Sequence, residues 1–512
     1  MDLDVLVRGG LVVDGTGEPA SHGDVGIKDG LIIGVGRLGE VEARQVIDAR
    51  GRVLLPGFVD CHSHGDAKVF EPAVQLAMVR QGVTTILLGQ DGVSFAPVSS
   101  RSALEFVSRY FAAINGWHPG VDGAVSVGEL LAGYDQKAAV NTAYLVPHGT
   151  VRYDVMGAAE RAADRDELLA MRTRVERGLS EGAVGLSSGL EYVPGRYADA
   201  GELAELCALL QGLPYVTHMR GYGASAGVGM AEVIEIARRS GAKAHVSHYH
   251  GPADDLLPLA AKAREEGVDL TFDTYPYMRG STILGMVVLP AWVPAADIDA
   301  AMDTLTTQGE RIKREWSEIV WDRLTLAHAP GVEWAEGLTL PEAAERHGTG
   351  VEEFCRTLLI ETRLEAGCVM ARPDEGPEAD RSVRTIMRDP GHLGGSDGIH
   401  LGGHPHPRAY GTFARYLARH VRDLADLTWE QAAVHLSAHP ARRFRLGDRG
   451  LIRPGQIADL IVADPATLAD QATYQNPREL ATGIDDVLVA GVPVLADGRL
   501  TGATPGRALR AA

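Results

Sequence analysis

Two histidines two positions apart, His62 and His64 in the segment PGFVDCHSH, are the first residues whose spacing could do chemistry. The apolar run before them predicts a β-strand, and side chains two apart leave a strand on the same side. Two imidazoles placed in this way can chelate a metal ion, and neutral imidazole is a usual zinc ligand. An H-x-H pair alone is equally typical of ordinary surface histidines, so the metal hypothesis depends on further ligands.

Two further histidines end later predicted strands. His218 lies in THMRGYG and His248 in HVSHYH. If these strands are parallel neighbours in one barrel, their carboxyl ends meet on one rim, where barrel active sites form. Four histidines on one rim favour a metal centre over four separate structural histidines.

Two aspartates also follow predicted strands, Asp91 in LLGQDG and Asp397 in GGSDG. A carboxylate can bridge or cap a metal ion, and one beside an activated water can act as a general base. The glycines around Asp397 let it approach the site closely, which favours it as the proton-handling residue. Asp before Gly is also a common turn pair, so a turn stays open as the alternative for Asp91.

The elements that must position these residues alternate as strand, loop and amphipathic helix, which is typical of parallel strands joined by helical crossovers. Eight segments have the apolar pattern of such strands: VLLPGFVD, TTILLG, NTAYLVP, AVGLSS, PYVTHM, KAHVSH, VDLTFD and GHLGGSD. Helical periodicity follows several of them, as in residues 166–180 and 225–240. The sequence therefore predicts an α/β fold, a (β/α)₈ TIM-type barrel, over residues 57–445.

Both ends of the chain carry short apolar strands broken by turn pairs, such as DVLVRGGLVVDG and GIDDVLVAGVPVLADGRL. We expect residues 1–56 and 446–512 to form one small β-sandwich domain. Residues 289–389 are too long for one crossover and contain helical segments around 309–319 and 351–364, so they form an expected insertion between the seventh and eighth strands. A moving lid and plain helical decoration both stay open for it.

The composition, with 45% hydrophobic and 23% charged residues, is that of a soluble globular protein. A net charge of −19, spread along the chain, argues against nucleic acid or an anionic membrane as a partner. The start of the chain lacks a basic segment before an apolar run, and no stretch reaches the ~20 apolar residues of a membrane span. Four scattered cysteines are expected to be free buried thiols. We therefore expect a cytoplasmic protein, and its oligomeric state is open.

Taken together, the strand ends resemble the amidohydrolase superfamily across nearly the whole chain. The resemblance is carried by PGFVDCHSH, GVTTILLGQDG, THMR, VSHYH, GSDG and RPGQIADLIVADP. LSSGLEYVPG, DTYPYMRGST, HPRAYGTF and the long insertion are similar to its N-acyl-D-amino-acid deacylase branch, the D-aminoacylases. This resemblance implies a zinc-dependent enzyme that hydrolyses the amide bond of an N-acyl-D-amino acid to a carboxylate and a free D-amino acid.

The resemblance also implies roles for single residues. Asp397 matches the proton-handling residue, and four positions match metal ligands: His62, His64, His218 and His248. Asp91 stands where the branch usually has a bridging cysteine, and a hard carboxylate in place of a soft thiolate can change both the metal preference and the number of ions. We expect one or two Zn²⁺ ions per chain, with Asp91 among the ligands.

The groups that hold the substrate carboxylate in this branch match Tyr275, Ser281 and Arg408. His250 stands where the branch has lysine, so carboxylate binding is expected to depend more on Arg408, whose planar guanidinium can form two parallel hydrogen bonds. Tyr192, after the fourth strand, is a candidate for lining the acyl pocket. A packed aromatic ring for Tyr275 and an internal ion pair for Arg408 are the alternatives.

Two other functions stay open. A hydrolase of cyclic amides, such as a hydantoinase or dihydroorotase, uses the same scaffold, although DTYPYMRGST and HPRAYGTF favour the linear-amide branch. A non-catalytic barrel that binds a metabolite is expected to have lost a metal-ligating residue. Here every metal-ligand position still carries a residue that can bind metal. The D preference comes from the resemblance alone, and the acyl group and the amino-acid side chain stay open.

Overall fold

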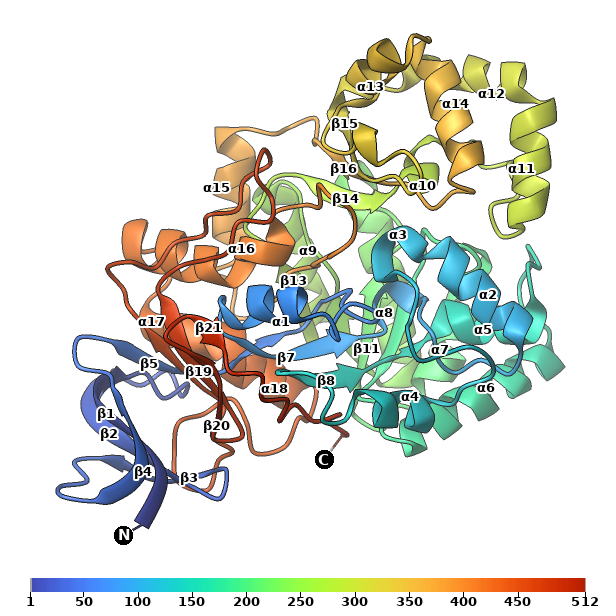
Figure 1. Ribbon diagram of the computed structural model, residues 1–512. Coiled ribbons are helices and arrows are strands. Elements are labelled where there is room, and N and C mark those ends of the chain that lie inside the picture. The colour runs from blue at the N-terminus through green and yellow to red at the C-terminus, as the bar shows by residue number, and fades with distance from the viewer. Residues whose placement is uncertain (1, 512) are drawn as a thin grey trace.

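The structure is a computed structural model, and it describes residues 2–511. A sheet formed by both ends of the chain lies beside a central set of parallel strands surrounded by helices, and a smaller lobe stands apart from that sheet (Figure 1). The α/β class predicted from the sequence is confirmed.

Parallel strands form the centre of the molecule. One sheet has the order β6-β7-β8 and the other β9-β10-β11-β12-β13-β17. Their bounds are β6 (Phe58–Asp60), β7 (Val83–Leu88), β8 (Asn141–Tyr144), β9 (Val146–Pro147), β10 (Leu186–Gly189), β11 (Pro214–His218), β12 (Lys243–Val246), β13 (Leu270–Thr274) and β17 (His392–Gly394). β8 and β9 are separated only by Leu145, and Cys61 N donates to Gly394 O at 3.0 Å, which joins the first of these strands to the last. Each of the eight predicted segments overlaps at least one of these strands.

Helices follow most of the strands, as the crossover pattern predicts. They are α1 (Pro72–Val79), α2 (Arg101–Tyr110), α3 (Ala112–Asn115), α4 (Val127–Tyr134), α5 (His148–Met156), α6 (Arg165–Ser180), α7 (Ala200–Cys207), α8 (Ala226–Ser240), α9 (Ala253–Glu265), α15 (Pro377–Ile386), α16 (Arg408–Arg415), α17 (Trp429–Ala433) and α18 (His439–Arg443). α6 begins with a capping box in which Asp164 and Glu167 each accept the other's backbone N–H, so the helix starts at a defined residue.

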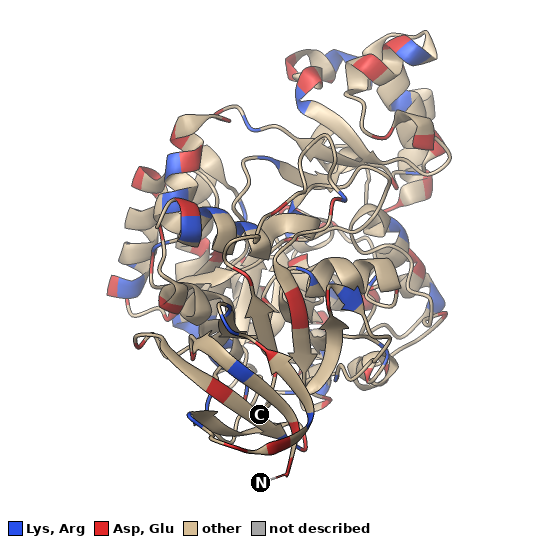
Figure 2. Ribbon diagram, turned by 60° about the vertical axis from the view of Figure 1, so that its left-hand side comes forward, with Lys and Arg blue, Asp and Glu red and all other residues tan. Residues whose placement is uncertain are grey.

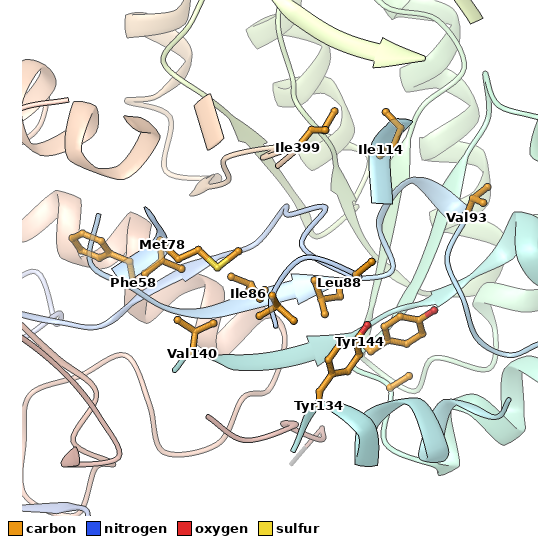
Figure 3. Close-up of a cluster of buried hydrophobic side chains, with 14 of the residues drawn as sticks. Phe58, Met78, Ile86, Leu88, Val93, Ile114, Tyr134, Val140, Tyr144 and Ile399 are labelled. Atoms are coloured by element: carbon orange, nitrogen blue, oxygen red, sulfur yellow. The ribbon is translucent and has the colours of Figure 1, made fainter. Parts of the chain in front are cut away.

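The largest apolar cluster holds these layers together. Figure 3 shows Ile86 and Leu88 of β7 beside Met78 of α1 and Tyr134 of α4, and all four side chains are buried. Burying one such side chain stabilises the fold by about 1.5–3 kcal/mol, and close packing fixes its position. The strands that end in polar residues are therefore held on a rigid framework.

Both ends of the chain enter one nine-stranded sheet. Its order is β21-β20-β19-β18-β5-β1-β2-β3, with β4 also beside β1. The strands are β1 (Asp2–Val12), β2 (Ser21–Lys28), β3 (Leu31–Gly36), β4 (Glu42–Asp48), β5 (Val53–Pro56), β18 (Leu460–Ala463), β19 (Ile484–Val489), β20 (Val492–Ala496) and β21 (Arg499–Leu500). The predicted strand VLLPGFVD is split: β5 pairs with β18, whereas β6 pairs with β7. The split falls at Gly57, where an added Cβ would lie 2.2 Å from Thr84 Oγ1.

Much of the predicted insertion, residues 289–389, belongs to a lobe with its own core, but this lobe begins earlier than predicted, at β14. The lobe contains β14 (Gly280–Ile283), α10 (Leu284–Val288), α11 (Ile298–Thr307), α12 (Gly309–Glu315), β15 (Leu324–His328), α13 (Leu340–His347), α14 (Val351–Glu361) and β16 (Gly367–Met370). The antiparallel sheet β14-β16-β15 was not predicted, because its strands are short and residue 280 pairs with residue 370. α15, within the predicted insertion range, packs against α9 of the central part instead.

Charged residues of both signs are interspersed over the outer helices and loops (Figure 2). The four cysteines are free and buried, as the sequence predicts. Among the helices of residues 2–511, none is both long and apolar enough to cross a membrane.

Candidate active site

The structure brings together all six residues that the sequence singled out at strand ends. They come from the carboxyl ends of five strands: His62 and His64 after β6, Asp91 after β7, His218 at the end of β11, His248 after β12 and Asp397 after β17. All are buried except His248, which is partly exposed. The carboxyl ends of parallel neighbouring strands meet on one rim, which we call the strand-end rule. This rule accounts for four imidazoles and two carboxylates in one cluster.

Asp397 and Asp91 each lie near the histidine pair. Asp397 Oδ1 lies 3.4 Å from His64 Nε2 and 3.7 Å from His62 Nε2. Asp91 Oδ1 lies 3.7 Å from His62 Nε2, and its Oδ2 lies 3.7 Å from His64 Nε2. On the opposite side, Asp91 Oδ2 lies 3.7 Å from His218 Nδ1 and 4.0 Å from His248 Nε2. Asp91 thus stands between two pairs of histidines.

Three members of the cluster have left-handed backbone conformations: Asp91 at φ 54°, His248 at φ 37° and Asp397 at φ 49°. Such conformations are uncommon for residues with a side chain and persist where the surrounding structure enforces them. They aim these side chains inward, and they occur where the polar cluster forms.

The donor atoms fit a divalent metal ion. His62 Nε2, Asp91 Oδ1 and His218 Nδ1 are buried and have no hydrogen-bond partner within residues 2–511. An unsatisfied buried polar atom costs about 1–3 kcal/mol, so three in one cluster indicate a ligand. In each of two groups of residues, the donor atoms lie within 4.8 Å of one another. One group is His62, His64 and Asp397, and the other is His62, Asp91 and His248. Imidazole nitrogen and carboxylate oxygen are ligands that zinc accepts.

The ring atoms that face away from this cluster are held by residues that the sequence analysis missed. Asp273 Oδ2 lies 3.3 Å from His62 Nδ1 and 3.1 Å from His245 Nε2, while Asp273 Oδ1 accepts the backbone N–H of His248 at 2.9 Å. A carboxylate at the second ring nitrogen fixes the orientation of a metal-binding imidazole. Asp273 ends the predicted strand VDLTFD, so the strand-end rule could have found it.

His64 and His218 are held in the same way. Asn115 Oδ1 lies 3.0 Å from His64 Nδ1, and Glu191 Oε2 lies 2.9 Å from His218 Nε2. Nε2 of His64 and Nδ1 of His218 therefore face the cluster. No sequence pattern marks Asn115, which ends the short helix α3, whereas Glu191 lies just after the fourth predicted strand.

The acidic side chains set the protonation of the cluster. Burial favours the neutral ring of His62, but Asp273 and Asp397 outweigh it and raise the pKa of His62 to about 10. Burial is likewise outweighed at His218, where Asp91 and Glu191 raise the pKa to about 9. At Asp397, the charges of Arg408 and His62 outweigh burial and hold the pKa below its usual range. Asp397 is thus ionised at neutral pH and able to accept a proton.

Arg408 is buried and pairs with Asp397. Its Nη2 lies 2.8 Å from Asp397 Oδ2, and the guanidinium carbon lies 4.5 Å from the centre of the Tyr275 ring. The internal ion pair considered for Arg408 is therefore present. Its Nη1 is buried and has no partner in the described chain, so one edge of the guanidinium is free to bind a ligand.

A cavity of about 560 Å³ opens beside this cluster. Its walls include all five predicted substrate-binding residues, Tyr192, His250, Tyr275, Ser281 and Arg408, as well as His64, Asp91, His218, His248 and Asp397. Apolar side chains complete it: Ile114, Met286, Met370 and Ile399. Ser281, Met286 and Met370 belong to the lobe that begins at β14, so this lobe forms one wall of the cavity. The ring nitrogens of His250 are close to the Tyr275 carbonyl, 2.9 Å, and to Thr274 Oγ1, 3.0 Å.

The family model described as "Amidohydrolase family" matches residues 45–279 and 284–495. A D-aminoacylase from Alcaligenes xylosoxydans xylosoxydans is 32% identical, and the match covers 99% of this chain and 97% of that protein. The crystal structure of N-acyl-D-glutamate deacylase from Bordetella bronchiseptica, complexed with zinc and a phosphonate mimic of the reaction's tetrahedral intermediate, is 31% identical, with a TM-score of 0.82 over 100% of both chains. A D-aminoacylase structure concerned with a binuclear metal centre, one-metal activation and second-metal attenuation is 30% identical, with a TM-score of 0.82 over 99% of this chain and 100% of that one. The chain belongs to the amidohydrolase family and, within it, to the branch of the N-acyl-D-amino-acid deacylases.

Proposed function

We propose that this chain hydrolyses the amide bond of N-acyl-D-amino acids, using bound zinc, and releases a carboxylate and a free D-amino acid. The observation that carries the proposal is the position of Asp397, 3.4 Å from His64 in the polar cluster and 2.8 Å from Arg408 on the cavity wall. One carboxylate thus touches both the candidate metal site and the candidate substrate site. The full-length similarity to D-aminoacylases supports the same reaction.

His62, His64, His218, His248 and Asp91 would hold one or two Zn²⁺ ions. The place of Asp91 between the two histidine pairs supports a bridging role, and the partnerless Asp91 Oδ1, His62 Nε2 and His218 Nδ1 support direct ligation. When bound, zinc lowers the pKa of water to ~7 and polarises a carbonyl oxygen. Asp273, Asn115 and Glu191 would fix the histidine rings in the orientation this needs.

Asp397 would handle the proton. Its low pKa keeps the carboxylate free to accept a proton from the attacking water. It would then donate that proton to the leaving nitrogen, so that the amine departs neutral. The proton need not reach bulk solvent between the two steps.

Tyr275, Ser281 and Arg408 would bind the substrate carboxylate, and Tyr192 and His250 complete the cavity around them. The free Nη1 edge of Arg408 supports this role. Ile114, Met286 and Ile399 give the cavity apolar walls for the acyl group or the side chain. The preference for the D form is proposed from the relatives. Location in the cytoplasm stays a prediction from the sequence.

We also propose that the eight parallel strands close into a (β/α)₈ barrel, residues 57–445. The parallel pairing of neighbouring strands and the bond from Cys61 N to Gly394 O support closure. Residues 1–56 and 446–512 would form a separate β-sandwich domain, and the shared sheet of both chain ends supports their association.

A substrate panel with metal removed and restored tests the function. We expect metal-free protein to be inactive on N-acetyl-D-amino acids and zinc to restore release of the free amine. Turnover of N-acetyl-L-amino acids alone would refute the D preference, and turnover of hydantoins or dihydroorotate alone would favour a cyclic amide hydrolase. No turnover of any compound by zinc-loaded protein would favour a metabolite-binding barrel.

A further inference from the structure

A second guanidinium, that of Arg372, faces the same cavity as Arg408. Arg372 lies just after β16 in the insertion and lines the cavity wall. Its Nη2 donates to Tyr275 Oη at 3.2 Å. The nearby Arg279 pairs with Glu375 at 3.0 Å, but within residues 2–511 Arg372 has no carboxylate at ion-pair distance. Arg372 therefore offers the cavity a positive charge that no carboxylate of the described residues neutralises at ion-pair distance.

Tyr275 connects this charge with Arg408. Arg408 lies over the face of the Tyr275 ring at 4.5 Å, and Arg372 meets the hydroxyl of the same ring. Of the two guanidiniums, only Arg408 has a carboxylate partner, Asp397. Asp255 and Asp374 also line the cavity, but within residues 2–511 neither forms an ion pair with Arg372 or Arg408. The two guanidiniums beside Tyr275 thus share one paired carboxylate, which favours an anionic ligand between them.

His250 does not offer a free donor at this place. Its ring lies against Tyr275, with 4.1 Å between the ring centres, and its nitrogens are close to the Tyr275 carbonyl and Thr274 Oγ1. The charged donors left on this wall are the guanidinium of Arg372 and the Nη1 edge of Arg408, beside the hydroxyl groups of Tyr275 and Ser281.

We propose that Arg372 binds the α-carboxylate of the substrate together with Arg408, with Tyr275 between them. This role rests on the proposed deacylase function and adds a specificity-determining residue to it. A guanidinium donates in a planar fork that matches a carboxylate, so two of them select substrates with a free α-carboxylate over N-acyl amines and amides. Because Arg372 belongs to the insertion and Arg408 does not, the bound carboxylate connects the insertion to the central part of the fold.

The test compares R372M and R372K with wild-type zinc enzyme on three substrates: N-acetyl-D-leucine, N-acetyl-D-leucine amide and N-acetyl-D-glutamate. R372M should lower kcat/KM about 10²-fold on both acids and less than about threefold on the amide, because a charge-assisted contact to the α-carboxylate is lost. R372K should lose about tenfold on the acids, since lysine keeps the charge without the fork. R381M, which removes an equal charge from the exposed face of α15, is the control and should match wild type.

Three results would overturn the role of Arg372. Equal losses on the acid and the amide would mean that Arg372 holds the loop, and thermal unfolding of each variant would show whether the fold is weakened. A loss confined to N-acetyl-D-glutamate would mean that Arg372 binds the substrate side chain. Unchanged kcat/KM in R372M would exclude any contact, while leaving the deacylase function intact. Inactive wild-type zinc enzyme would instead contradict the function and this role with it.

Discussion

Replacing Asp273 by asparagine should weaken zinc binding although Asp273 is not itself a candidate ligand. Asp273 Oδ2 lies 3.3 Å from His62 Nδ1 and 3.1 Å from His245 Nε2, and Oδ1 accepts the N–H of His248 at 2.9 Å. Asparagine has nearly the same shape and can keep the bond from the His248 N–H. The substitution removes the negative charge beside His62 Nδ1, and that charge makes His62 Nε2 a stronger metal ligand.

The size of the effect follows from two opposing consequences of that charge. Removing the outer partner of a ligand histidine costs about 10–100-fold in metal affinity, or about 1.4–2.7 kcal/mol. Asp273 also helps to raise the pKa of His62 to about 10, against burial and together with Asp397. Below the pKa of His62 a proton competes with zinc for this ring. Each pH unit below that pKa therefore weakens zinc binding about tenfold.

The sign of the pH dependence is therefore fixed. The pKa of His62 is raised in the wild type, so competition by the proton is strong at pH 7 and nearly absent near pH 10. In D273N the pKa falls and the competition at pH 7 becomes weaker. The variant should lose most affinity near pH 10 and less at pH 7, as measured by zinc competition with a chromophoric chelator at both pH values.

An equal loss at both pH values would refute the competition argument, and no loss at either would refute the orienting role of Asp273. D389N is a matched control, because Asp389 pairs with Arg264 at 2.7 Å outside the cavity. Its zinc affinity should equal that of the wild type.

Substitutions at three further positions test the roles proposed for the site. D397N should lower kcat by roughly 10²-fold or more with zinc content kept, as elemental analysis would show, and near-normal kcat would exclude the proton role. D91A should reduce zinc per chain and activity together, whereas unchanged stoichiometry would favour a turn residue. R408K and R408M should each lose roughly 2–5 kcal/mol in kcat/KM on N-acyl-D-amino acids and little on N-acyl amines, and an equal loss on both would argue that Arg408 only holds its loop.

The strands and the polar cluster could be predicted because their signals are local. Short segments rich in β-branched and apolar residues, each ending at or just before a polar residue, mark β7 and β11 in the sequence itself. Once the strands are parallel neighbours, geometry alone brings together the residues at their ends. The same rule applies to Asp273, but its strand end, VDLTFD, carries no histidine and no neighbouring glycine that would mark it.

Other features depend on contacts between distant segments and left no local signal. Asn115 of α3 meets His64 from 51 residues further along the chain, and the sheet β14-β16-β15 pairs residues far apart in sequence. The break at Gly57 lies within an apolar run, and the contact that leaves no room for a side chain there comes from Thr84 on the next strand. Arg372 gave no signal either, since the fold alone brings it to the hydroxyl of Tyr275.

The pair formed by Arg408 and Asp397 connects substrate recognition with proton transfer. The charge of Arg408 contributes most to holding the pKa of Asp397 low. A low pKa makes a carboxylate a weak base. A substrate carboxylate that binds Arg408 shares the positive charge, so the pKa of Asp397 rises toward the range in which it takes a proton from water most effectively. A substrate without that carboxylate leaves Arg408 paired with Asp397 alone. Selection for the carboxylate should therefore be visible in kcat as well as in KM, which a binding contact remote from the base would not produce.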